Sequence, residues 1–400
     1  MHGRVAARVR ELAPALVALS HRVHTAAEIG FTERLSVAAV VETLAAQGIE
    51  VRVGVHGLET ALEARIGAGS PRVGLLAEYD ALPDIGHGCG HNVICATAVG
   101  AFLGLAEVVG ETKGTVVLLG TPAEENGSGK EVMARRGAFD DLDAVLMLHP
   151  GAGETIADAS ALGLRSVEVT YHGVAAHASA FPEAGRNALD AVVAAYQGIA
   201  MLRQHMSPND RVHGIITDGG QAANVVPLRA SARFLLRSPD VTRLVGLSRR
   251  VHAVLEGAAL ITETRLDARW DQVPPCLPVR SNSALANRFG AYLGVPPGAG
   301  GTLLGSTDLG NVSLRVPSIH PMVAIAPEGT VLHTAEFAAH AESARADAVV
   351  VDGALALART ALDFLTDPDL RQAVRAEFEA AGGRLDVEAL MAPPVSRAAD

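Results

Sequence analysis

Cysteine is scarce in this sequence. The 400 residues contain only Cys89, Cys95 and Cys276. An odd and sparse set of this kind argues against a framework of disulfides. Each thiol is therefore expected either in the hydrophobic core or as a ligand.

Charged residues and long apolar runs are also few. The chain is 19% charged with a net charge of -11 and has no Lys/Arg cluster, which argues against a nucleic-acid partner. No segment approaches the roughly 20 apolar residues of a membrane helix. The N-terminal stretch mixes charges into a helical apolar pattern, unlike a signal peptide. We expect no membrane partner and a cytoplasmic location.

What the sequence does have is apolar and glycine-rich. It is 49% hydrophobic with 41 glycines, as in a heavily buried α/β enzyme. Apolar strand patterns at Arg72 to Asp80, Thr115 to Glu124 and Ala144 to His149 alternate with helical patterns. This alternation predicts an α/β domain with a parallel or mixed sheet covered by helices. Polar residues repeatedly follow these strands, where open α/β sheets bind ligands.

A second domain is expected because 400 residues exceed the usual size of one core. From about Leu164 the pattern becomes strand, helix, strand, strand, helix, strand, the order of a ferredoxin-like unit. Val-Pro-Pro before Cys276 suggests a linker. We therefore predict a discontinuous catalytic domain of residues 1–163 and 277–400, with an inserted α+β lid and dimerisation domain of residues 164–276.

The segment Gly86 to Asn92, GHGCGHN, places a thiol and imidazoles among glycines at the start of a predicted helix. Glycines allow neighbouring side chains to turn toward one point. A thiolate and an imidazole, as in Cys89 and His91, suit a borderline-soft divalent metal. The alternative is a glycine turn with a buried cysteine and a surface histidine.

The segment PAEENGSG puts Glu124 and Glu125 at the end of an apolar strand. Adjacent side chains point in different directions, so one carboxylate can bind metal while the other accepts a proton from an activated water. A solvated acidic turn is the more common meaning of a lone Glu-Glu pair. Only the neighbouring motifs favour the metal-site interpretation.

Two further histidines complete the candidate set. His149 ends an apolar strand, where a lone histidine is more often a core residue, and His333 lies in EGTVLHTAEF, where it could be a surface turn residue. The joint occurrence of a thiol, three imidazoles and two carboxylates near strand ends of one domain favours a metal site. It does not identify a substrate.

Ten motifs in order resemble one family along the whole chain: HRVHTAAEIGFTE, AEYDALP, GHGCGHN, PAEENGSG, LMLHPG, GVAAHAS, GRNALDA, NVVP, STDLGNVS and LHTAEF. They are similar to the zinc- or manganese-dependent amidohydrolases that include aminoacylase, indole-acetyl-amino-acid hydrolases and p-aminobenzoyl-glutamate hydrolase subunits. GSTDLGNVS and the tail helix look most like the branch with p-aminobenzoyl-glutamate hydrolase and β-alanyl-lysine dipeptidase-like proteins.

The resemblance implies a role for nine residues. The implied metal ligands are Cys89, His91, Glu125, His149 and His333, and the implied general base is Glu124. His177, in the inserted domain, resembles a histidine that stabilises the oxyanion, commonly in the partner subunit's active site. Asn224 and Arg237 resemble residues that meet the substrate's carboxylate. The alternative for His177 is a surface residue at a strand end, and Asn224 and Arg237 could equally have no role in binding.

Two positions depart from the family pattern. Relatives outside this branch often have His-x-Asp where this chain has Glu78-Tyr79-Asp80, and some cysteine-containing relatives have aspartate at the position of Asn92. Both departures leave open whether one or two divalent cations bind, and whether they are zinc or manganese.

The resulting hypothesis is hydrolysis of an amide bond in an N-acyl amino acid or dipeptide-like substrate by metal-activated water, in a homodimer or higher homo-oligomer. One alternative is a non-catalytic metal-binding or sensor protein on the same fold, which would not need Glu124. Another is a nucleophilic hydrolase that uses Cys89 or a serine, but the sequence has no G-x-S-x-G motif.

Overall fold

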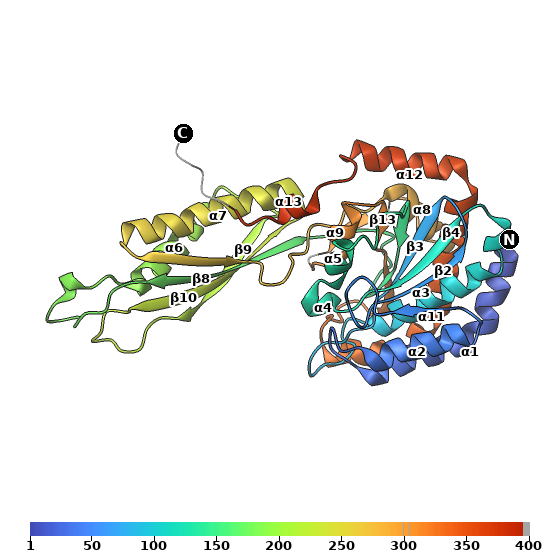
Figure 1. The fold of residues 1–400 in the computed structure, drawn as a ribbon, viewed down its shortest axis with the longest axis horizontal. Coiled ribbons are helices and arrows are strands. Elements are labelled where there is room, and N and C mark those ends of the chain that lie inside the picture. Colours follow the sequence, from blue (N-terminus) through green and yellow to red (C-terminus); the bar gives the residue numbers. More distant parts are fainter. Residues whose placement is uncertain (299, 304, 395–400) are drawn as a thin grey trace. The chain divides into compact units, whose positions relative to one another are not determined.

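The computed structural model describes residues 1–298, 300–303 and 305–394. The chain divides into two compact units (Figure 1). Unit 1 comprises Met1–Ala161 and Val279–Asp386, and unit 2 comprises Leu162–Pro278 together with the described residues from Val387 onward. No helix among the described residues has the length and apolar character needed to span a membrane.

Unit 1 contains a six-stranded mixed sheet, which confirms the expected α/β class. Its strands run in the order β1 (Arg52–Val53), β2 (Leu62–Gly67), β4 (Thr115–Gly120), β3 (Arg72–Ala77), β5 (Ala144–Leu146) and β13 (Ser318–Ile319). The first two pairings are antiparallel and the other three are parallel. All of β4 and nearly all of β3 are buried, because helices cover both faces of the parallel part.

Two short parallel pairs extend this arrangement. Strand β6 (His149–Ala152) pairs with β14 (Met322–Ala326), and β7 (Asp158–Ala161) pairs with β12 (Gly300–Leu303). His149 therefore opens β6, whereas the sequence placed it at the end of the preceding strand. The reason is that the backbone changes partner after Leu146, from β13 to β14, and this change fixes the position of His149.

Helix α3 (His91–Ala106) lies at the centre of unit 1 and is buried almost throughout because it is apolar on all sides. It packs against α1 (His2–Ala26) and α11 (Ala344–Thr366), as Figure 1 shows. The other helices of this unit are α2 (Arg34–Ala45), α4 (Glu124–Gly127), α5 (Gly129–Ala134), α8 (Ser283–Tyr292), α9 (Leu309–Ser313), α10 (Ala335–His340) and α12 (Pro368–Ala380).

The inserted part of unit 2 is a four-stranded antiparallel sheet covered by two long helices. Its elements follow in the order β8 (Gly163–His172), α6 (Ala188–Arg203), β9 (Arg211–Asp218), β10 (Arg229–Ser238), α7 (Val241–Ile261) and β11 (Arg265–Trp270), and the sheet order is β11-β8-β10-β9. The side chains of Asn187 and Asp240 cap the first turns of α6 and α7. Both helices pack on each other and on the central strands.

The end of the chain differs from the sequence expectation. The sequence assigned residues 277–400 to the catalytic domain, but the short helix α13 (Val387–Met391) groups with unit 2. The buried side chain of Arg165, on β8, explains this. It donates hydrogen bonds to the carbonyl oxygens of Met391 and Ala392 and pairs with Asp271.

Candidate metal centre

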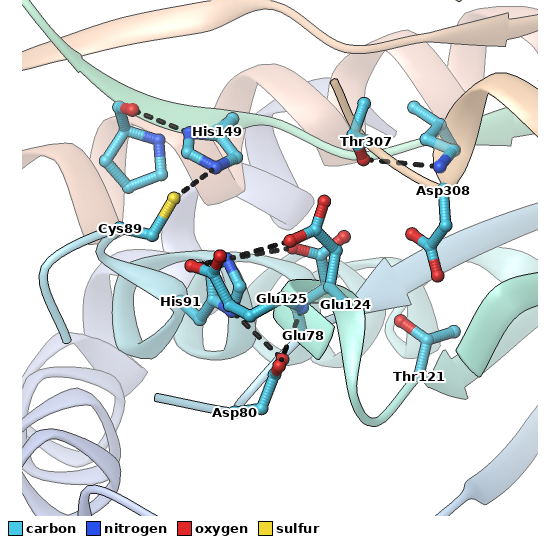
Figure 2. A network of polar contacts seen from close by, with 12 residues as sticks. Glu78, Asp80, Cys89, His91, Thr121, Glu124, Glu125, His149, Thr307 and Asp308 are labelled. Carbon is cyan, nitrogen blue, oxygen red and sulfur yellow. Dashed lines mark hydrogen bonds and ion pairs between the residues drawn. The ribbon is translucent and has the colours of Figure 1, made fainter. Parts of the chain in front are cut away.

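His91 opens helix α3 with one ring nitrogen fixed and the other directed into a polar space. Asp80 Oδ1 lies 3.0 Å from Nδ1 and accepts a hydrogen bond from it. Three carboxylates then surround Nε2, with Glu78 Oε2 at 3.5 Å, Glu125 Oε1 at 3.7 Å and Glu124 Oε2 at 3.9 Å. Figure 2 shows this convergence. A carboxylate that fixes one nitrogen leaves the other available as a metal ligand.

Cys89 and His149 meet on the other side of the same space. Cys89 Sγ lies 3.4 Å from His149 Nε2, while His149 Nδ1 donates to the Pro150 carbonyl at 2.7 Å (Figure 2). Two ligands of one tetrahedral zinc ion are about 3.3–3.7 Å apart, given the usual Zn–N and Zn–S lengths. Burial is the main cause that lowers the pKa of His149 to about 3. The ring is therefore neutral, the form that binds metals.

The two glutamates are held by a strained turn after β4. Ala123 has a positive φ of 58°, and its N–H donates to the buried carboxylate of Glu33 at 2.9 Å. A side chain at Gly129 would collide with the Pro122 carbonyl, so only glycine fits there. Non-glycine residues at positive φ are uncommon and concentrate at functional sites. This turn aims Glu124 and Glu125 together toward His91.

His333 stands at the rim of the centre. It also has a positive φ, 63°, and its backbone N–H donates to the Gly88 carbonyl at 2.8 Å. Its Nε2 lies 3.6 Å from Glu125 Oε2, and its side chain is 52% exposed. The loop containing His333 is thus tied to the glycine-rich loop of Cys89, from a region of the chain about 245 positions away.

The six predicted residues of unit 1 form three overlapping groups of possible ligand atoms, each within 4.8 Å: Cys89, His91 and His149; Cys89, Glu125 and His333; His91, Glu124 and Glu125. Within the described residues, His91 Nε2 and Glu125 Oε1 are buried without a hydrogen-bond partner. Buried polar atoms are normally paired. This mixed set of sulfur, nitrogen and oxygen donors fits a divalent cation.

The electrostatics of the centre point the same way. Burial, followed by the charges of Glu78 and Glu125, raises the pKa of Glu124 well above its usual range. Burial and the charge of Glu125 likewise raise the pKa of the Cys89 thiol. Burial opposes a charge on His91, but Asp80 outweighs it and raises the pKa of His91. Burial and neighbouring carboxylates thus oppose negative charge on Glu124 and Cys89, and a bound cation would offset this opposition.

The sequence did not indicate a buried ion triad that adjoins the centre through Glu78. Lys130 Nζ lies 2.5 Å from Glu78 Oε1 and 2.6 Å from Asp308 Oδ1, and all three side chains are fully buried. The Lys130 backbone N–H also donates to Asp308 Oδ2. The two carboxylates occur in the quoted motifs AEYDALP and STDLGNVS, and Lys130 immediately follows PAEENGSG. Nothing in the local pattern indicated that they pair.

The three predicted residues of unit 2 fall at two places in this unit. His177 forms a bridge with Val225, and the Ala178 N–H donates to the Asn224 carbonyl, so His177 and Asn224 are neighbours and both are exposed. Arg237 pairs with Leu164 near the far end of β10. It is eight positions beyond Arg229, about 26 Å along an extended strand. A single copy of unit 2 therefore separates Arg237 from His177 and Asn224.

Comparison with known proteins identifies the family. The sequence profile described as peptidase family M20/M25/M40 matches residues 74–363. The chain belongs to this family. It is 36% identical to the Xaa-Arg dipeptidase of Mus musculus over 94% of this chain and 91% of that protein.

Solved structures share the fold of this M20 chain. An aminobenzoyl-glutamate utilization protein from Klebsiella pneumoniae superposes with a TM-score of 0.70 at 22% identity, covering 90% of this chain and 98% of that one. A dinuclear metal-binding peptidase of the M20 family from Bacillus subtilis gives a TM-score of 0.67 at 19% identity, covering 87% and 98%.

Family membership decides between the general functions that the sequence allowed. The chain is a metal-dependent enzyme that hydrolyses amide bonds. The non-catalytic sensor is not favoured, because the related proteins are hydrolases and peptidases. The recognition of an aminoacylase-like amidohydrolase from the motifs is confirmed.

Proposed function

We propose that this M20 enzyme hydrolyses the amide bond of an N-acyl amino acid or a dipeptide-like substrate in a site formed by unit 1. The proposed cation ligands are Cys89, His91, Glu125, His149 and His333. The observation that carries the proposal is the convergence of their ligand atoms, from four separate chain segments, around a space that Glu124 also faces. Related proteins include a dipeptidase and a p-aminobenzoyl-glutamate hydrolase subunit, which supports this substrate class.

A pair of cations is the occupancy that the ligand set supports. Five ligand side chains in overlapping groups exceed the four of a tetrahedral structural site. The buried carboxylates of Glu78, Asp80 and Asp308, together with the largely buried Glu124 and Glu125, outnumber the ammonium of Lys130, so positive charge would stabilise the cluster. Thiolate and imidazole favour zinc, while the carboxylates also suit manganese.

Glu124 is the proposed general base. When bound, the cations would polarise the scissile carbonyl and lower the pKa of a water molecule. Glu124 would then take a proton from the attacking water and deliver it to the departing amine nitrogen, acting first as general base and then as general acid. The turn anchored by Glu33 would keep this carboxylate beside His91 during both transfers.

Unit 2 is the proposed ferredoxin-like lid and dimerisation unit. Its βαββαβ order and β11-β8-β10-β9 sheet match that topology. Strand β9 is an edge strand with Ile215 and Ile216 exposed, and an edge of this kind can pair with a second copy. Two copies would also allow Arg237 of one chain and His177 and Asn224 of the other to meet one substrate, which one copy cannot do.

A substrate screen tests the proposed function. Purified protein loaded with zinc or manganese should release free amine from at least one class among N-acyl amino acids, aminobenzoyl-glutamate and β-alanyl dipeptides. A chelator should abolish the release, and added metal should restore it. Activity that survives exhaustive chelation, or the absence of cleavage across the panel, would overturn the proposal.

A further inference from the structure

His320 is a buried histidine for which neither the motifs nor the ligand groups give a role. It lies between β13 and β14, next to Pro321, whose carbonyl oxygen accepts a hydrogen bond from the His149 backbone at 2.8 Å. The centroids of the His320 and His149 rings are 5.2 Å apart, with the rings tilted by 40°. The strand pair that positions His149 thus also places His320 beside the metal centre.

The His320 ring is enclosed but unpaired. The residue is 3% exposed, and neither Nδ1 nor Nε2 has a hydrogen-bond partner among the described residues. Burial, and after it the positive charge of Lys130, lowers the pKa of His320 to about 3. A neutral imidazole has one N–H donor and one acceptor nitrogen, and leaving both unused in the interior is costly.

The other buried histidines of unit 1 each have at least one paired ring nitrogen, whereas His320 has none among the described residues. His91 donates to Asp80 and His149 to the Pro150 carbonyl. His87, which is also buried, uses Nε2 to contact the Val23 carbonyl at 2.9 Å. Within the described residues, none of the three groups of possible ligand atoms includes His320. Its nitrogens are therefore better placed for a hydrogen-bonding ligand beside the cations than for a cation.

We infer that His320 is a substrate-binding residue that forms hydrogen bonds with the polar atoms of the amide substrate next to His149. The inference rests on the proposed function, because it takes the space between these histidines and the carboxylates as the place where the amide binds. The alternative is a structural histidine that only fills the core between β14 and β6.

Two readouts separate these roles. If His320 binds the substrate and makes no hydrogen bond within the protein, an apolar ring in its place removes unpaired polar atoms. The melting temperature of His320→Phe should then be unchanged or higher than that of the wild type. The same variant should bind zinc or manganese with wild-type affinity and lose about 10–100-fold in kcat/KM, the range for one or two hydrogen bonds. His320→Gln, which retains a donor and an acceptor, should recover part of that loss.

His87→Phe is the matched control for stability, since it removes a buried histidine that has a backbone partner, and its melting temperature should fall. The inference is overturned if His320→Phe keeps the wild-type kcat/KM, if it lowers the melting temperature as His87→Phe does, or if it loses cation affinity. If wild-type protein cleaves no compound, the proposed function fails on its own. Calorimetric binding of the same compounds then decides: weaker binding to His320→Phe supports the role of His320, and equal binding overturns it.

Discussion

The residues that the sequence selected behave differently in the two units. In unit 1, Cys89, His91 and His149 are buried within reach of one another, and each ring is oriented by a hydrogen bond. In unit 2, His177 and Asn224 are exposed, and Arg237 is toward the other end of β10. Unit 1 brings the proposed cation ligands together, whereas unit 2 presents separate polar groups.

Because the candidate ligands cluster in unit 1 and His177 lies in unit 2, mutations should be able to separate cation binding from catalysis. Variants of the ligand set in unit 1 should change both, because a cation needs those atoms to bind. Variants of His177 should change only turnover, because a hydrogen-bond donor for the oxyanion acts when charge develops on the substrate. The predictions below test this separation.

The largest effect is expected for Glu124→Gln. An amide cannot accept the proton of the attacking water, so kcat should fall by about 10²–10⁴-fold. The stoichiometry of bound zinc or manganese, measured on the same sample, should stay at the wild-type value because the five ligands remain. Glu50→Gln, an exposed glutamate of unit 1, is the matched control. Full activity in a Glu124→Gln protein that retains its metal would show that Glu124 is not the general base.

Lys130→Met should have the next largest effect, on stability. It would leave Glu78 and Asp308 as buried carboxylates without their ammonium partner. Breaking a buried ion pair from one side typically costs about 3–5 kcal/mol. Urea unfolding of the metal-free protein should show such a loss in the free energy of unfolding. Lys113→Met, at an exposed position, should change it by less than about 0.5 kcal/mol. Equal stability of both variants would show that the triad is not an ion pair.

The sequence pointed to the residues that converge around His91 better than to the residues that hold them in position. Cys89, His91, Glu124 and Glu125 were recognisable because residue types with specific chemistry occur in short motifs. Asp80, Lys130 and Glu33 were not assigned roles, although Asp80 orients His91 and Glu33 anchors the turn before Glu124. Their roles depend on contacts between distant segments, and no local pattern encodes such contacts.

The fold likewise has features that local patterns predict and features that depend on distant contacts. Strand and helix alternation was enough for the α/β class of unit 1, because buried parallel strands are continuous apolar runs. The attachment of α13 to unit 2 could not be predicted. It depends on hydrogen bonds from Arg165 to the carbonyl oxygens of Met391 and Ala392, which are about 225 positions away in the sequence. His320 escaped notice for a similar reason, since a single histidine before proline has no distinctive pattern.

His177→Asn should have an intermediate effect on kcat, and it tests the contribution of unit 2 alone. Loss of one oxyanion donor typically lowers kcat by about 10²–10³-fold. Cation affinity and the melting temperature should not change, because the exposed side chain of His177 hydrogen-bonds with its neighbour Ser179 and is not buried in the core. His205→Asn, at another exposed histidine of unit 2, should keep wild-type activity.

Mixing two inactive variants tests whether His177 acts across subunits. Co-refolded His177→Asn and Glu124→Gln chains should recover part of the activity, since one site of a mixed dimer would have both residues intact. Failure to recover activity in a verified mixed dimer would assign His177 to the site of its own chain.

The smallest effect concerns Glu63, a buried charge of unit 1 away from the centre. Burial opposes its ionisation, but Arg65, His56 and Arg52 outweigh this and lower the pKa of Glu63 from 4.5 to about 2. Because the folded pKa lies below the unfolded one, this stabilisation is present above about pH 5 and disappears as the pH falls toward 2. Its size should be about 1–2 kcal/mol, since the arginine partners are partly exposed.

Glu63→Gln should therefore lose less stability than the wild type between pH 5 and pH 2, as measured by urea unfolding at each pH. Glu59→Gln, whose ion pair with Arg34 is exposed on both sides, should follow the wild-type pH dependence. The catalytic rate should be unaffected in both variants, because neither residue contacts the cation ligands. A Glu63→Gln variant with the acid sensitivity of the wild type would show that the ion pairs of Glu63 do not contribute to the acid unfolding of unit 1.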